Sequence, residues 1–265
     1  MLKVFRYFYP IFLTCILVVG FSSQACELVI KAASSDDWPP YFFKAYEEEA
    51  GLEVDILHTV LEKTPFCLEF VSMPSLSRAV EELRHKRVDL LVASSFSEDR
   101  ATFSHYSKSY RDEKMVMFEN KHNKSLVQTL ATKPNYEDYI NQENMIIAVH
   151  RGSHYGKKFN QFLADFKGNT ISTTFARQRF DLLKKGRVDI AIEDQLAGVF
   201  LMADANYYDH IVNSQIVVFN EPVYYMLRKG LMNEQQLEVF NQAIEDSLQQ
   251  IQDLIQEYSN YKPKL

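Results

Sequence analysis

The residues best suited to chemistry in this sequence stand directly after short apolar runs that have the pattern of buried strands. Arg100 closes a polar segment that includes Ser95, and Asp194 closes an apolar run that begins at Val188. Ser153 follows another such run, within the sequence Arg-Gly-Ser-His. In open α/β sheets, ligands collect beyond the carboxyl ends of the strands. We therefore expect these side chains to meet at one site.

These residue types are complementary to a zwitterion. A guanidinium such as that of Arg100 offers a carboxylate two parallel N–H donors, and an acidic side chain holds an ammonium group. The segment after Arg151 is predicted to open a helix, where free backbone N–H groups attract anions. An isolated arginine is more often structural or solvated, so the prediction depends on the combination.

The elements that position these residues alternate in type along the chain. Short apolar runs alternate with amphipathic segments, in one of which Val54, Leu57 and Leu61 recur at helical spacing. This alternation is typical of βαβ units with largely parallel sheets. The predicted strands are 28–33, 68–73, 88–94, 145–150, 170–175, 188–192, 216–219 and 224–228.

One stretch of sequence occurs twice. Residues 83–92 read LRHKRVDLLV, and residues 183–192 read LKKGRVDIAI. Each copy has the pattern of a basic helix end, a turn and a buried strand, and positive side chains suit the C-terminus of a helix. Two similar units that begin at residues 83 and 183 predict two similar α/β lobes.

The sequence resembles the extracellular solute-binding proteins of the polar amino-acid transport type, such as glutamine- and histidine-binding proteins. The resemblance extends from about Leu28 to Tyr258. Its motifs are WPPY at 38–41, GLEVDI at 51–56, RVDL at 87–90, SEDRA at 97–101, SKSY at 107–110, GS at 152–153 and GRVD at 186–189. It implies a two-lobed, periplasmic-binding-protein-like (type II) α/β fold, in which each lobe is a mostly parallel sheet flanked by helices.

The resemblance also implies roles for the residues that could hold the polar ends of the ligand. Arg100 would bind the ligand carboxylate, together with the backbone N–H of Ser153. The hydroxyl of Ser95 and the carbonyl of Ala93 would hold the amino group, and Asp194 would neutralise its charge. These residues give the site two poles of opposite charge.

Two aromatic residues complete the implied site. Trp38 would lie against the side chain of the ligand, with Tyr41 nearby. The chain departs from the family pattern at Ser35, where an aspartate or threonine is common, and at Ala93, where a glycine is common. Both departures bear on the identity of the ligand more than on the fold.

The implied domain organisation has two lobes joined by two crossings of the chain. Residues 26–118 and 221–265 would form the first lobe, and residues 119–220 the second. Residues 1–25 have the pattern of a secretory signal peptide, with basic residues before an apolar run and small residues at its end. An uncleaved membrane anchor stays an alternative.

Cleavage after Ala25 would leave two cysteines in the mature chain, Cys26 and Cys67. An even pair in an oxidising compartment, with each cysteine directly before a predicted strand, predicts a disulfide. Two buried thiols are one alternative. Lipidation of Cys26 is another, and it would forbid the bridge.

We therefore expect a monomeric, non-enzymatic protein of the periplasm that uses no cofactor or metal. It would close around an amino acid or a related solute and present it to a membrane permease. The chain has 29 basic and 35 acidic residues and no basic stripe, so nucleic acid is not an expected partner.

Three other functions stay open. The protein could report to a membrane receptor without transport, or it could be a dehydratase-type enzyme on the same scaffold. Glu193 and Asp194 could form an acid–base pair, although neighbours on a strand point to opposite faces. Metal capture by His150 and His154 is the third alternative.

Overall fold

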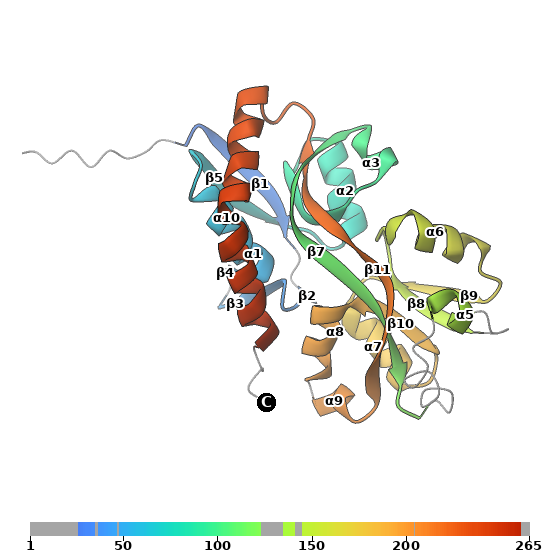
Figure 1. Cartoon of the computed structure of the whole chain (residues 1–265). Coiled ribbons are helices and arrows are strands. Elements are labelled where there is room, and N and C mark those ends of the chain that lie inside the picture. The colour runs from blue at the N-terminus through green and yellow to red at the C-terminus, as the bar shows by residue number, and fades with distance from the viewer. Residues whose placement is uncertain are drawn as a thin grey trace, which may run out of the picture.

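The computed structural model describes residues 26–34, 37–46, 48–122, 135–140, 145–203 and 205–260, and the predicted signal peptide and Ser35 lie outside these ranges. Its central feature is an eight-stranded mixed sheet of order β5-β1-β6-β11-β7-β10-β8-β9 (Figure 1). The strands are β1 (Leu28–Ser34), β5 (Phe66–Ser72), β6 (Leu90–Ser95), β7 (Ser104–Asn120), β8 (Ile146–His150), β9 (Asn169–Thr173), β10 (Ile190–Asp194) and β11 (Ile211–Arg228).

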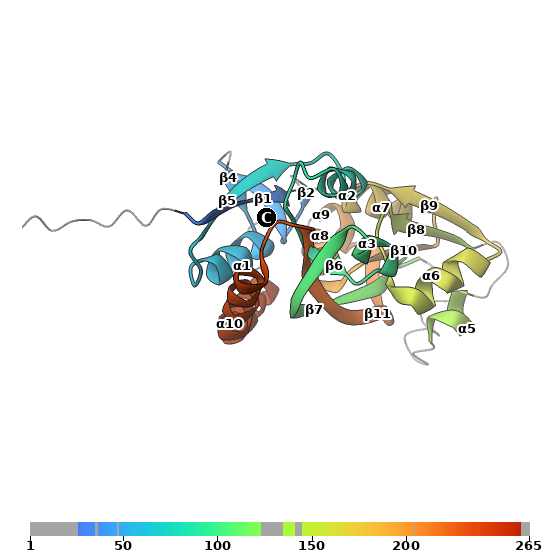
Figure 2. The ribbon, with the colours of Figure 1, turned by 90° about the horizontal axis from the view of Figure 1, so that it is seen from above.

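One half of this sheet is built from the parallel strands β5, β1 and β6. Its helices are α1 (Leu52–Leu61), α2 (Leu76–Arg84), α3 (Glu98–Ala101) and α10 (Glu234–Asn260). The long helix α10 buries Phe240, Ile244 and Ile251 at helical spacing and lies beside α1 (Figure 2). The C-terminal helix therefore packs on the half of the molecule that contains the first strands.

The other half is built from the parallel strands β10, β8 and β9. Its helices are α5 (Tyr136–Ile140), α6 (Gly156–Asp165), α7 (Ala176–Lys184), α8 (Gln195–Met202) and α9 (Ala205–Tyr208). Each half has its own buried apolar clusters, one set around Leu57 and Leu83 and the other around Ile147 and Phe180. The two predicted lobes are therefore confirmed, and the domain limits at 118 and 220 stay a prediction.

Two long antiparallel strands, β7 and β11, join the halves and pair with each other along most of their length. The sequence predicted no strand at β7, and it predicted two strands where β11 runs continuously through 211–228. Both predictions were wrong because the centres of the strands are polar. Residues 220–222, including Pro222, are exposed where β11 crosses between the halves, so the apolar pattern stops there while the backbone continues.

The predicted disulfide between Cys26 and Cys67 is present, with Cα atoms 5.6 Å apart. It joins the start of β1 to the start of β5, which pair in parallel, with Leu28 opposite Phe66. None of the helices in the described ranges is long and apolar enough to cross a membrane.

A second, small sheet consists of β2 (Asp37–Trp38), β3 (Phe42–Ala45) and β4 (Glu48–Ala50). It leads into α1 through Gly51, whose φ is 124°. A Cβ at Gly51 would lie 2.3 Å from the carbonyl oxygen of Tyr41, so the close approach requires glycine. The backbone N–H of Glu53 donates to that same oxygen over 3.1 Å. The first turn of α1 thus fixes the turn that carries Trp38.

Candidate functional site

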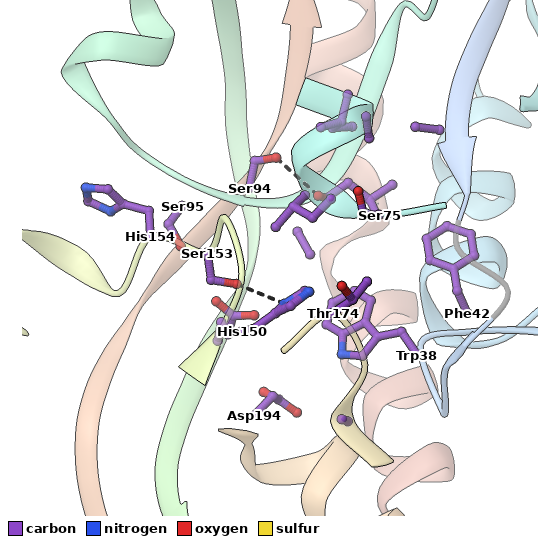
Figure 3. Close-up of a pocket in the computed structure, with 18 of the residues that line it drawn as sticks. Trp38, Phe42, Ser75, Ser94, Ser95, His150, Ser153, His154, Thr174 and Asp194 are labelled. Carbon is purple, nitrogen blue, oxygen red and sulfur yellow. Dashed lines mark hydrogen bonds between the residues drawn. The ribbon is translucent and has the colours of Figure 1, made fainter. Parts of the chain in front are cut away.

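A cavity of about 130 Å³ lies between the two halves of the molecule. One wall comes from the ends of β1 and β6 and from α2, and the other from the loop after β8, the start of α7 and the end of β10 (Figure 3). The predicted site residues that line it are Trp38, Ala93, Ser95, Arg100, Ser153 and Asp194. The structure therefore gathers residues that are far apart in the sequence around one cavity.

Arg100 enters this cavity from α3. Its Nη2 atom donates a hydrogen bond to the carbonyl oxygen of Gly152 in the other half, over 2.7 Å. Burial lowers the pKa of the Arg100 guanidinium, but an arginine keeps its charge in proteins. No carboxylate within the described residues forms an ion pair with Arg100. A guanidinium that is desolvated and forms no ion pair with a described residue is suited to receive the carboxylate of a ligand.

Ala93 and Ser95 lie at the end of β6, as expected. Ala93 has a φ of 46°, in the left-handed region that favours glycine, and its N–H donates to the hydroxyl oxygen of Tyr110 over 2.7 Å. This backbone conformation explains why a glycine suits the position. Ser95 is 6% exposed and lines the cavity, and its hydroxyl makes no hydrogen bond with another described residue. That hydroxyl is therefore available to a ligand.

Asp194 borders the cavity at the end of β10, but much of its hydrogen-bonding capacity is used. Its Oδ1 atom accepts a hydrogen bond from the N–H of Ala197 over 2.9 Å, so Asp194 is the N-cap of α8. The same oxygen accepts the hydroxyl of Tyr41 over 2.8 Å. Burial is the main reason that the pKa of the Asp194 carboxyl is raised, and nearby Arg111 and these hydrogen bonds partly offset it.

Tyr41 is not among the residues that line the cavity, but it lies next to Trp38, as expected. Its ring stacks behind that of Trp38, with centroids 4.3 Å apart. The guanidinium of Arg111 lies 4.7 Å from the Tyr41 ring centroid, and Arg111 Nε donates to Glu53 Oε1 over 2.7 Å. A buried ion pair therefore supports Tyr41, which in turn supports both Trp38 and Asp194. The motif at 51–56 contributes Glu53 to this support, a role that the sequence alone did not reveal.

The end of β8 presents His150 to the cavity, and the loop that follows presents Ser153. The Oγ atom of Ser153 lies 3.0 Å from Nδ1 of His150, a hydrogen bond drawn in Figure 3. The Ser153 N–H, which was predicted to bind the ligand carboxylate, donates to the carbonyl oxygen of His150 over 3.3 Å. Burial, followed by the nearby charge of Arg179, lowers the pKa of His150 to about 3, so this ring is neutral at physiological pH.

The metal alternative gains no support from the described part of the chain, where no three His, Cys, Asp or Glu residues gather closely enough to hold a metal ion. The acid–base alternative meets a different obstacle. Glu193 is buried and forms an ion pair with Arg179, which also donates to Thr173 Oγ1 over 3.0 Å. Since Asp194 caps a helix, both carboxylates of this pair are engaged by groups of the protein.

Sequence reasoning missed one carboxylate that lines the cavity, Glu113 on β7. It is half-buried and makes no hydrogen bond or ion pair with a described residue. Burial raises the pKa of Glu113 to about 8; Arg111 opposes this shift, and nearby Asp194 adds to it. The signal in the sequence was the charged run 111–114, which interrupts the strand pattern directly before the apolar residues 115–118.

The two halves touch around the cavity, so the structure shows the closed arrangement. Two of the contacts are the hydrogen bonds from Arg100 to Gly152 and from Tyr41 to Asp194. A third is steric: Gly152 has a φ of 83°, and a Cβ there would lie 2.4 Å from Oγ of Ser77 on α2. The lobes therefore meet through specific side chains.

Comparison with known proteins identifies the family. The family model for bacterial extracellular solute-binding proteins, family 3, matches residues 30–258. The chain belongs to this family. Family 3 proteins are extracellular by their description, and this match confirms the resemblance seen in the sequence motifs. No curated protein sequence matches the chain.

Solved structures share the fold of this family 3 protein. An ancestral arginine-binding protein bound to arginine aligns with a TM-score of 0.71 and 18% identity, covering 88% of this chain and 99% of that one. The P235GK mutant of ArgBP from T. maritima aligns at 0.70 and 19%, covering 88% and 96%. The ancestral amino acid-binding protein AncCDT-1, a precursor of cyclohexadienyl dehydratase, aligns at 0.70 and 17%, covering 88% and 95%. These likenesses confirm the two-lobed α/β fold class.

Proposed function

We propose that this protein captures a small amino-acid-like zwitterion in the cavity between its lobes. The observation that carries the proposal is the placement of Arg100, a desolvated guanidinium without a carboxylate partner among the described residues, at the wall of the cavity between the lobes. Asp194 borders the same cavity from the opposite half. A ligand with a carboxylate and an ammonium group complements both poles.

The remaining lining residues fit this ligand. The Ser95 hydroxyl has no partner within the described residues and can bind either polar end of the ligand. The loop that carries Ser153 closes over the Arg100 side of the cavity through Gly152. Trp38, held in place by Tyr41, offers an aromatic face to the apolar part of the ligand.

Binding would be coupled to closure of the lobes. Because the lining comes from both halves, a ligand that contacts both has differential affinity for the closed state and shifts the population toward it. We infer that the protein acts outside the cytoplasm and presents the closed complex to a membrane permease. Membership in an extracellular solute-binding family supports this location, and one neighbour in fold is the substrate binding protein of an amino acid ABC transporter. A receptor that senses the closed form is the alternative partner.

We also propose that the protein does not turn over its ligand. The adjacent acids Glu193 and Asp194 are each engaged by protein groups, an arginine in one case and a tyrosine with a helix N-terminus in the other. The structure thus supports binding at these residues more than proton transfer.

A thermal-shift screen of residues 26–265 against the common L-amino acids tests the proposal. A ligand present at 100 times its Kd stabilises the native state by about 2.7 kcal/mol, which raises the unfolding midpoint by several degrees. We expect at least one amino acid to raise the midpoint in this way. A compound that keeps the side chain of that amino acid but lacks both the carboxylate and the amino group should have no effect. A screen in which no amino acid raises the midpoint would contradict the proposal.

A further inference from the structure

The charges around the cavity do not match a ligand with a single ammonium group. Two buried ion pairs neutralise themselves within the protein, Arg111 with Glu53 and Arg179 with Glu193. The lining histidines add no charge at neutral pH, because burial lowers the pKa of His150 and that of His154. The charged side chains that remain at the cavity are Arg100, Asp194 and Glu113. One cation therefore faces two acidic side chains.

Glu113 is the more accessible of these two carboxylates. It is half-buried, whereas Asp194 is 3% exposed. Asp194 already accepts the Tyr41 hydroxyl and the N–H of Ala197. Glu113 accepts no hydrogen bond from any described residue, although it lines the cavity. A carboxylate placed in this way still needs a donor or a counter-charge.

The surroundings of Glu113 are mostly acidic. On β11, Glu221 lies directly opposite it in the strand register, and on β10 the carboxylates of Asp194 and Glu193 act on it. Arg111, on its own strand, is the nearby cation, but it is committed to Glu53 on α1. The end of the cavity at Glu113 therefore holds more acidic than basic groups, and the nearby cation is already engaged, so the protein offers no counter-charge to an ionised Glu113.

We propose that the ligand carries a second positively charged group, as in a dibasic amino acid, and that Glu113 receives this group. The proposal rests on the proposed function, in which Arg100 takes the carboxylate and Asp194 takes the α-ammonium group. Glu113 then determines specificity for a cationic over an uncharged ligand side chain. A bound cation would supply the counter-charge that the protein does not provide at this carboxylate.

Binding of such a ligand releases a proton near neutral pH. Glu113 has a pKa of about 8 in the unliganded cavity, so at pH 7 its carboxyl is mostly protonated. A cationic group favours the ionised form and must displace that proton. The affinity for a cationic ligand therefore increases with pH up to about 8, by at most about tenfold per pH unit. An uncharged analogue shows no such increase.

Isothermal titration with two matched pairs of probes tests this inference. L-arginine is compared with L-citrulline, and L-lysine with N6-acetyl-L-lysine, because each pair differs in the charge of the side chain. The wild-type protein, Glu113→Gln and Glu221→Gln are titrated at pH 6.5 and at pH 8.5. Glu221→Gln is the matched control, because it removes the acid opposite Glu113 in the strand register, which does not itself line the cavity.

We expect the wild-type protein at pH 8.5 to bind one cationic probe at least tenfold more tightly than its uncharged partner. This preference should fall below threefold in Glu113→Gln and persist in Glu221→Gln. An uncharged probe that binds wild type as tightly as its cationic partner would overturn the inference. Equal weakening of both members of a pair by Glu113→Gln would overturn it too, since Glu113 would then act on the shared α-amino group. If no amino acid binds the wild-type protein at all, the proposed function itself fails.

Discussion

The hydrogen bond between Tyr41 and Asp194 gives the sharpest test of how the lobes are held together. It spans 2.8 Å between the two halves, and both residues are 3% exposed. Phenylalanine at position 41 removes the hydroxyl but keeps the stacking on Trp38. A hydrogen bond to a charged group contributes about 1.5–3 kcal/mol. Since 1.4 kcal/mol is about a factor of ten, Tyr41→Phe should lower the ratio of closed to open protein by about 10- to 100-fold.

The consequence for binding follows from the population of the closed form. If only the closed form holds the ligand, the apparent Kd rises in proportion to the loss of that form, by up to about 100-fold. Small-angle X-ray scattering measures the open fraction, and isothermal titration measures the Kd of the amino acid found in the thermal-shift screen. Tyr46→Phe is the control, because Tyr46 is fully exposed. Unchanged or tighter binding in Tyr41→Phe would refute the reasoning, because the ligand would then replace the Tyr41 hydroxyl at Asp194.

Three other perturbations have defined outcomes. Replacing Cys26 and Cys67 with serine opens a loop with a sequence separation of 41, so the free energy of unfolding in urea should fall by about 4 kcal/mol. Dithiothreitol should then not lower the free energy of unfolding of this variant any further. In the ligand-free protein, the pKa of Glu113 is raised from 4.5 to about 8, so protonated Glu113 stabilises the native state fully below pH 4.5, and this stability is lost as the pH rises through 8. Glu113→Gln should therefore raise the unfolding midpoint at pH 9 and leave it unchanged at pH 4.5. Gly152→Ala should weaken ligand binding about tenfold because its Cβ meets Ser77 Oγ and its φ is one that L side chains rarely adopt. Adding Ser77→Ala should recover about threefold of that loss, and a double variant no better than the single one would assign the whole defect to the backbone at position 152.

The sequence predicted some strands because they are buried along nearly their whole length. Strands β8 and β10 are buried in this way, so their apolar runs are nearly continuous and easy to recognise. Strand β7 was missed because it leaves one apolar core, crosses between the lobes and enters the other. Its centre, 111–114, consists entirely of charged residues. A polar crossing of this kind looks like a loop in the sequence although its backbone pairing is unbroken.

The same crossing explains which parts of the site could be predicted. Arg100, Ser153 and Asp194 stand directly after recognisable strands or in family motifs, so their meeting at one cavity could be expected. Glu113 lies inside a strand that was not predicted, and its position at the cavity depends on the pairing of β7 with β11. The support of Tyr41 by a buried ion pair depends on contacts between α1 and β7 that have no local signature.

The most direct test of the central claim is a cycle that combines a change in the protein with a change in the ligand. The amino acid identified in the screen and the amine formed by removing its carboxylate are titrated into wild-type protein and into Arg100→Ala. Charge-assisted hydrogen bonds to a carboxylate contribute about 1.5–3 kcal/mol. Removing the carboxylate should therefore weaken binding to wild type by about 10- to 100-fold and binding to Arg100→Ala by less than threefold. An equal loss in both proteins would show that Arg100 does not bind the carboxylate and would contradict the account of the site.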